Sequence, residues 1–203
     1  MAIKTNGVDT NVLNLLNGKV DTSEITATAA ANKIPRLDSE GKLPSGTYML
    51  SSKAKYIKIT DTKPSSTNGG TFTSGAWRTR DLNTIDTDDT EEVSLSSNEF
   101  TLPAGTYILK AFVPAYKVNY HKAKLYDITN STDKLIGTSA NTDNNTYVVT
   151  NSIIAGKFTI TSSTIFEIRH YCITTRSSDG FGQGYTPGIT SEVYTTVELW
   201  KVA

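Results

Sequence analysis

Alternation with a period of two dominates most of this 203-residue chain and constrains its fold more than any other feature. From Tyr48 onward, apolar residues alternate with Thr, Ser and charged residues in short runs. Gly, Pro, Asn, Asp and Ser interrupt these runs roughly every 8 to 12 residues. The pattern predicts a mainly β protein of roughly eight to ten short strands, arranged as an antiparallel jelly-roll sandwich.

The predicted strands share this alternation and are bounded by turn residues. The clearest turn is the Pro103-Ala104-Gly105 step, which separates two apolar runs. The expected strands cover residues 55–60, 76–85, 93–95, 100–102, 107–113, 121–129, 135–140, 146–160, 164–174 and 193–202.

The last expected strand is apolar on both faces. Val193, Val197 and Leu199 share one face, whereas Tyr194 and Trp200 share the other. Because only one face of a strand meets the core of a lone sandwich, the second face needs another cover. A neighbouring subunit is the simplest candidate, so Tyr194 and Trp200 are predicted trimer-interface residues.

Residues 1–46 differ from the rest of the chain in their sequence pattern. Val8, Val12, Leu15 and Leu16 stand at helical spacing, and Gly18 indicates a stop. So short a helix is marginal alone, so its apolar stripe either packs on its own domain or associates with copies of itself. We favour self-association, which makes these four residues predicted trimer contacts.

The predicted helix is followed by an extended stalk. Pro35 and Pro44 lack amide donors and resist both a helix and a central strand, and small residues surround them. The sequence therefore predicts two parts, an anchoring and trimerising segment over residues 1–46 and a β-jelly-roll head over residues 47–203.

Charge and composition exclude several functions. Twenty Lys and Arg balance twenty Asp and Glu, which argues against nucleic acid as a partner. One cysteine excludes an intrachain disulfide and a multi-cysteine zinc site. No apolar run approaches the roughly 18 residues of a membrane span, and the N-terminus lacks a signal-peptide core. We expect a protein made in the cytoplasm, with no membrane insertion.

Catalytic and metal-binding patterns are weak. His170 and Cys172 lie two apart on one strand and could form a couple, but a small buried cysteine is the more ordinary interpretation. Glu167 and Glu198 could act as paired carboxylates only if the fold brought them together. The acidic run 86–92 lacks the glycine of an EF-hand loop and fits a solvated turn. We expect no enzyme activity, cofactor or metal.

Two loops are candidates for recognition. The glycine-rich run 179–188 is either a flexible hairpin connection or a binding loop, since long loops in compact domains are often functional. Its aromatic rings could stack on sugars and its polar groups could bind hydroxyls or carboxylates. The predicted receptor-binding residues are Arg176, Asp179, Phe181, Gln183 and Tyr185, together with Asn144 and Tyr147 of a second loop, residues 141–147.

Five segments of the head carry a family resemblance: residues 76–85, 100–116, 122–129, 156–172 and 192–202. Taken in this order, they resemble jelly-roll heads of the C1q and tumour-necrosis-factor type, in the version found at the ends of phage fibres. The N-terminal run "KVDTSEITATAAANKIPRLDSEGKLPSG" is similar to the linker of such fibres. The collagen-like repeats that precede the C1q head are absent from this chain.

The resemblance implies a homotrimeric bacteriophage virion fibre, of the tail or the head. Its N-terminal segment would join another virion structural protein, and its head would bind a glycan or protein of the host surface. Two alternatives remain: a structural decoration protein that binds no receptor, and a glycan-active enzyme on the same scaffold.

Overall fold

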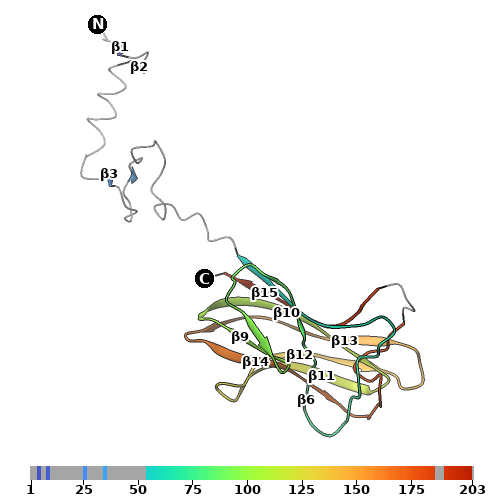
Figure 1. Cartoon of the computed structure of the whole chain (residues 1–203). Helices are drawn as coiled ribbons and strands as arrows, with labels where there is room; N and C mark the ends of the chain where they lie inside the picture. Colours follow the sequence, from blue (N-terminus) through green and yellow to red (C-terminus); the bar gives the residue numbers. More distant parts are fainter. Residues whose placement is uncertain are drawn as a thin grey trace. The chain divides into compact units, whose positions relative to one another are not determined.

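The computed structural model describes residues 54–185 and 190–202, together with four two-residue strands nearer the N-terminus. The chain divides into two compact units, Met1–Ser52 and Lys53–Ala203 (Figure 1). In the first unit, two pairs of short strands are defined: β1 (Lys4–Thr5) pairs antiparallel with β2 (Val8–Asp9), and β3 (Ile25–Thr26) pairs parallel with β4 (Ile34–Pro35).

Most of the expected N-terminal helix lies outside the described residues. Val8 itself lies in β2, whereas Val12, Leu15 and Leu16 are not described. The stalk, its trimerising role and the boundary between residues 46 and 47 stay predictions.

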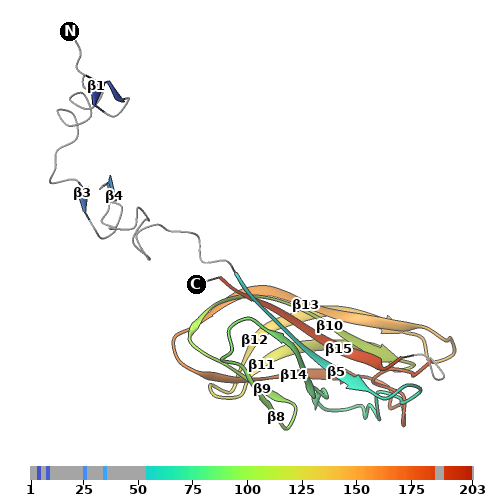
Figure 2. The same ribbon diagram turned by 45° about the horizontal axis from the view of Figure 1, so that its top comes forward.

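The second unit contains two antiparallel sheets (Figures 1 and 2). The first sheet has the order β13-β10-β15-β5-β7, and the second has the order β12-β11-β14-β9-β8, with β6 beside β14. The strands of the first sheet are β5 (Lys55–Lys63), β7 (Thr84–Asp88), β10 (Gly105–Tyr116), β13 (Val149–Ile160) and β15 (Glu192–Lys201). Those of the second are β6 (Arg78–Thr79), β8 (Ser94–Ser96), β9 (Glu99–Leu102), β11 (Asn119–Asp127), β12 (Thr132–Thr142) and β14 (Thr164–Cys172).

The strand order is that of a jelly roll. Neighbours such as β10 and β15, or β11 and β14, are distant in sequence, and the chain passes repeatedly from one sheet to the other. Such long-range antiparallel pairing is built from Greek-key connections. The predicted fold class, a mainly β antiparallel jelly-roll sandwich, is confirmed.

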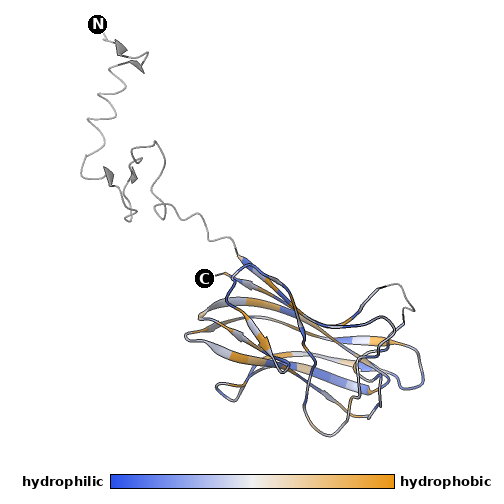
Figure 3. Ribbon diagram, viewed as in Figure 1, coloured by the Kyte–Doolittle hydropathy of each residue, from blue (hydrophilic) through white to orange (hydrophobic). Residues whose placement is uncertain are grey.

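The core lies between the two sheets and follows the predicted alternation (Figure 3). In β10, Tyr107, Leu109 and Ala111 are buried, whereas Ile108 and Lys110 between them face outward and are exposed. The inward side chains of the second sheet meet them from the other side. Burial of these apolar side chains, at about 25 cal/mol per Å², is the main stabilising contribution.

The expected strand over residues 76–85 is wrong in extent. Only Arg78–Thr79 pair with the second sheet as β6, and β7 begins at Thr84 in the first sheet. Between them the chain crosses from one sheet to the other: the Arg80 N–H donates to the Ile168 carbonyl of β14, whereas the Asn83 N–H donates to the Thr60 carbonyl of β5. Arg80 and Leu82 are both buried at this crossing.

The alternation of β15 is interrupted near its start. A register shift against β5 lies between Val193 and Thr196, which is typical of a β-bulge. Tyr194 and Thr195 are consequently both buried although they are adjacent, while Val193 is 54% exposed.

Candidate functional site

Four connecting segments gather at one end of the sandwich (Figure 2). Strands β5, β10, β12 and β14 end there, and β11, β13 and β15 begin there. Residues 54 and 202 lie at the opposite end, since Lys55 pairs with Lys201. We call the first of these ends the loop end; its segments are residues 64–77, 117–118, 143–148 and 173–185.

The structure brings three predicted recognition residues together at the loop end. Lys117 Nζ lies 3.9 Å from the centre of the Tyr147 ring and 5.4 Å from that of Tyr116. The Arg176 guanidinium lies 5.6 Å from the same Tyr116 ring and donates two hydrogen bonds, of 2.6 and 2.8 Å, to Asp179. Segments 143–148 and 173–185 therefore meet through Tyr116 and Lys117. Arg176 binds the carboxylate of Asp179 within its own segment.

The other predicted loop residues have different environments. Tyr185 is 86% exposed and Tyr147 is 83% exposed, and Asn144 is also on the surface. Phe181 is buried, with its ring centre 4.6 Å from that of Phe72. Its side chain therefore anchors the loop to the domain.

A buried arginine fixes the loop end from beneath. Arg80 is fully buried, and it donates hydrogen bonds to Thr195 Oγ1 at 2.8 Å, to the Pro114 carbonyl at 3.2 Å and to the Phe181 carbonyl at 2.9 Å. Burial lowers its pKa to about 10, while the negative charge of Asp61 acts against this shift. The arginine thus ties segment 173–185 to β10 and β15.

The two histidines of the chain form a buried pair just below this end. His121 Nδ1 lies 2.9 Å from His170 Nε2, and His121 Nε2 lies 2.8 Å from Thr150 Oγ1. The His170 ring packs against Phe72. Burial lowers the pKa of His121 to about 4 and that of His170 well below its usual value, and the positive charge of Arg80 acts in the same direction on both.

The structure does not support a Cys–His couple. His170 is hydrogen-bonded to His121, whereas the Cys172 thiol lies 3.3 Å from the Thr174 carbonyl oxygen. Burial raises the pKa of Cys172 to about 11, so the thiolate is disfavoured. The cysteine is a small core residue, as its buried-strand pattern indicates.

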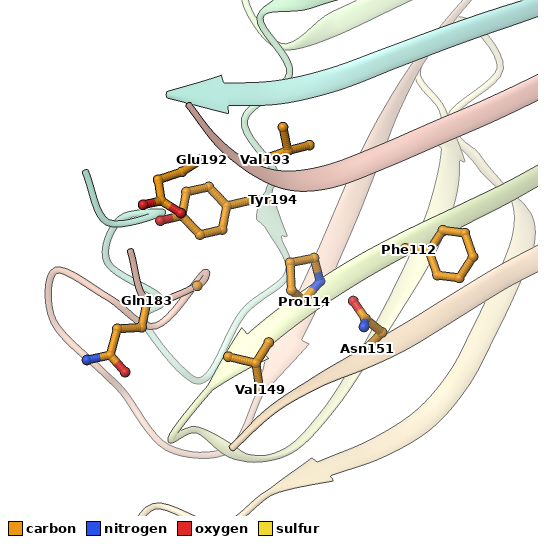
Figure 4. Close-up of a pocket in the computed structure, with 9 residues that line it drawn as sticks. Phe112, Pro114, Val149, Asn151, Gln183, Glu192, Val193 and Tyr194 are labelled. Carbon is orange, nitrogen blue, oxygen red and sulfur yellow. The ribbon is translucent and has the colours of Figure 1, made fainter. Parts of the chain in front are cut away.

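A cavity of about 350 Å³ opens on the outer face of the first sheet at the loop end (Figure 4). Strands β10, β13 and β15 supply most of its lining, and segment 173–185 supplies the rest. We call it the Tyr194 pocket. Its lining residues are Phe112, Pro114, Val149, Asn151, Gly182, Gln183, Glu192, Val193 and Tyr194.

Two interactions shape the Tyr194 pocket. Gly182 has a φ of +149°, and a Cβ there would overlap the Tyr194 ring, so only glycine lets the loop approach so closely. The Tyr194 hydroxyl donates a 2.6 Å hydrogen bond to the Thr67 carbonyl. Glu192 Oε1 accepts backbone N–H groups from Ser66 at 3.0 Å and from Tyr185 at 3.2 Å.

Of the predicted recognition residues, Gln183 is the one that lines the Tyr194 pocket. Tyr194, predicted as a trimer contact, is covered by its own loop. Sequence reasoning did not identify three of the lining residues, Asn151, Phe112 and Glu192. They lie on three strands that pair only in the folded sheet, and each resembles an ordinary outward-facing strand residue.

The outer face of the first sheet carries an apolar patch in its other half. Ile108 is 43% exposed, and its cross-strand partner Trp200 lies with its ring centre 5.4 Å from that of Tyr56. We call Tyr56, Ile108 and Trp200 the apolar patch. It lies toward residues 54 and 202, away from the loop end.

Paired carboxylates are not formed by the residues predicted for them. Glu167 lies on β14 of the second sheet, between the inward residues Phe166 and Ile168, and Glu198 lies on β15 of the first sheet between Val197 and Leu199. The two carboxylates thus point outward from opposite faces of the sandwich.

The acidic run 86–92 forms a turn organised by one carboxylate. Asp88 accepts hydrogen bonds from the backbone N–H groups of Thr90 and Val93, both at 2.9 Å. Despite the cost of burial, these bonds leave its pKa below the usual value. Among the described residues, neither a metal-ligating cluster nor a helix able to cross a membrane is found.

Comparisons with known proteins find only distant similarity to solved structures. No family model and no curated protein matches the chain. Murine APRIL at pH 8.0 is 10% identical, with a TM-score of 0.46 over 73% of this chain and 99% of that one. The globular domain of the zebrafish complement 1qA protein is 11% identical, with a TM-score of 0.41 over 74% of this chain and 97% of that one. We assign the jelly roll from the strand order itself.

Proposed function

We propose that the chain is a homotrimeric bacteriophage virion fibre whose head binds a host-surface glycan or protein at the loop end. The placement of the loops carries the proposal. Chain entry at residue 54 lies at the end of the sandwich opposite the loop end. A head held through its N-terminal segment can therefore offer its loops to another surface, and loops on a rigid sandwich commonly carry binding sites.

The trimer is supported by the apolar patch. Trp200 and Ile108 belong to the most central strands of the first sheet, yet their side chains point away from the core and stay partly exposed. Exposed aromatic and aliphatic groups on one face are typical of protein interfaces. Burying them against two further copies would also give three parallel binding sites, which together tolerate weak individual contacts.

The N-terminal segment, residues 1–46, is proposed to join another virion structural protein. Under this proposal the protein is made in the host cytoplasm and ends in the virion. It needs neither a cofactor nor a metal for binding.

Two measurements test the proposal. Native mass spectrometry should give a mass three times that of the 22.0 kDa chain. Fluorescently labelled full-length protein should then bind intact host bacteria, and variants with exposed loop residues such as Tyr147 and Tyr185 replaced by alanine should bind less. A monomer would refute the fibre assembly, and a trimer that ignores host cells would favour the structural decoration protein.

A further inference from the structure

We propose that the Tyr194 pocket binds a neutral sugar residue. This inference rests on the proposed function, because it names the class of ligand that the head would take at the loop end. It also assigns most of the ligand contacts to residues of strands β10, β13 and β15, which lie outside the loops.

The size and position of the pocket suit a small ligand. Its volume of about 350 Å³ lies within the range of roughly 300–1,000 Å³ typical of ligand sites. It opens at the loop end, whereas the apolar patch occupies the other half of the same sheet face. A trimer formed through the apolar patch therefore leaves the pocket to a ligand.

The lining combines an apolar surface with hydrogen-bonding groups. Phe112, Pro114 and Val149 supply the apolar surface, which suits the C–H face of a pyranose ring. The Asn151 side chain offers an amide donor and a carbonyl acceptor, and its amide lies beside Pro114 in Figure 4. The Glu192 carboxylate is an acceptor for sugar hydroxyl groups.

Charge selects a neutral sugar over an acidic one. The nine lining residues include one carboxylate, Glu192, and neither lysine nor arginine. A uronic or sialic acid would bring a second carboxylate next to Glu192 with no cation in the lining to balance it, and like charges at close range repel. A hexose or an N-acetylhexosamine meets no such penalty.

The pocket is largely formed before any ligand arrives. Its floor belongs to paired strands, and Glu192 is held by the N–H groups of Ser66 and Tyr185. Tyr194 is fixed between the Gly182 backbone and the Thr67 carbonyl. Preorganisation of this kind reduces the entropy lost on binding.

Side-chain amide signals in ¹H–¹⁵N NMR spectra of the full-length protein provide a local test. The probes are galactose, glucose, N-acetylglucosamine and N-acetylgalactosamine, with glucuronic acid and N-acetylneuraminic acid as acidic counterparts. We expect at least one neutral sugar to shift the Asn151 and Gln183 amide signals saturably, and the acidic sugars to leave them in place.

Asn151→Leu should weaken binding of that sugar at least tenfold, and Glu192→Gln should weaken it while preserving the backbone hydrogen bonds to this side chain. Asn130→Leu is the matched control, since Asn130 is an exposed asparagine in the turn between β11 and β12, at the end of the sandwich opposite the loop end. The thermal unfolding midpoint of each variant shows whether weaker binding reflects the loss of a ligand contact or the loss of the folded structure.

Some outcomes would overturn the inference. They are the absence of any neutral-sugar shift at Asn151 and Gln183, a stronger response to acidic sugars, or equal affinity of Asn151→Leu and the control. Binding of the full-length protein to host cells is measured in parallel. If the protein binds cells but no neutral sugar shifts the Asn151 and Gln183 signals, the inference fails and the proposed function stands. If sugars bind in the pocket but the protein does not bind cells, receptor attachment fails instead.

Discussion

The buried histidine pair predicts that the head loses stability on mild acidification. His121 and His170 are hydrogen-bonded to each other inside the domain, with the buried cation Arg80 nearby. Their pKa values are lowered in the folded state, so the unfolded chain binds more protons below pH about 6.5. Stability from this pair is therefore complete above that pH and declines as the pH falls.

The magnitude follows from the pKa of His121. A fall from an unfolded value of about 6.5 to about 4 corresponds in full to about 3 kcal/mol, of which about 2 kcal/mol is already lost at pH 5. His170 adds a loss of the same sign. For a domain of this size, 2 kcal/mol corresponds to a fall in melting temperature of about 4–8 °C.

Other buried groups also titrate, so the assay compares two proteins. Burial raises the pKa of Asp61, which contributes in the opposite direction because the folded state then holds the extra proton. A double variant, His121→Asn with His170→Gln, keeps hydrogen-bonding amides in place of both imidazoles and cannot titrate. Thermal unfolding by circular dichroism at pH 8 and pH 5, at one protein concentration, gives the pH-dependent loss for each protein.

We expect the wild type to lose at least about 2 kcal/mol more than the double variant between the two pH values. The variant will be less stable overall, but this offset cancels in the difference. Equal losses in the two proteins would show that the histidines are protonated to the same degree in the folded and unfolded states, and the reasoning would be refuted.

Three further changes test other parts of the structure. Gly182→Ala should destabilise the loop by about 1–3 kcal/mol, because its φ is unfavourable and the added Cβ meets Tyr194; the thermal midpoint and the Tyr194 ring signals report this. Arg80→Met should cost about 3 kcal/mol or more in chemical denaturation, since it leaves two buried carbonyls unpaired. A Trp200→Glu, Ile108→Glu double variant should turn the proposed trimer into a folded monomer in sedimentation velocity; an unchanged trimer would place the interface elsewhere.

The sequence predicted the sandwich well because most strands obey a local rule. In β10, the alternating residues Tyr107, Leu109 and Ala111 face the core. A 2.8 Å hydrogen bond from the Tyr107 hydroxyl to the Pro103 carbonyl stabilises the turn before this strand. The burial of every second residue in a strand follows from the local sequence of a few residues, and the folded strands keep this pattern. The prediction failed over residues 76–85, where the side chains of Arg80 and Leu82 are buried at a crossing between sheets.

The candidate site was less predictable because its parts meet only through long-range pairing. Asn151 and Phe112 lie 39 positions apart and Glu192 lies further still, and nothing in their local sequence distinguishes them from solvent-facing strand residues. The same holds for His121 and His170, which neighbouring strands bring within 2.9 Å. Tyr194 illustrates a further obstacle, since a bulge in β15 and the close approach of Gly182 decide its burial.

The outer face of the first sheet has two halves with different chemistry, and this division links assembly to binding in the proposed fibre. Near residues 54 and 202, Ile108 and Trp200 belong to the apolar patch; near the loop end, Asn151 and Glu192 bring polar groups into a cavity. Apolar surface gains from being covered by another protein, whereas a preformed polar cavity gains from a ligand that replaces water. One continuous sheet supports both, so three copies joined through the patch would hold three pockets in fixed relation. A weak affinity for one sugar residue would then suffice for attachment, because simultaneous engagement multiplies it.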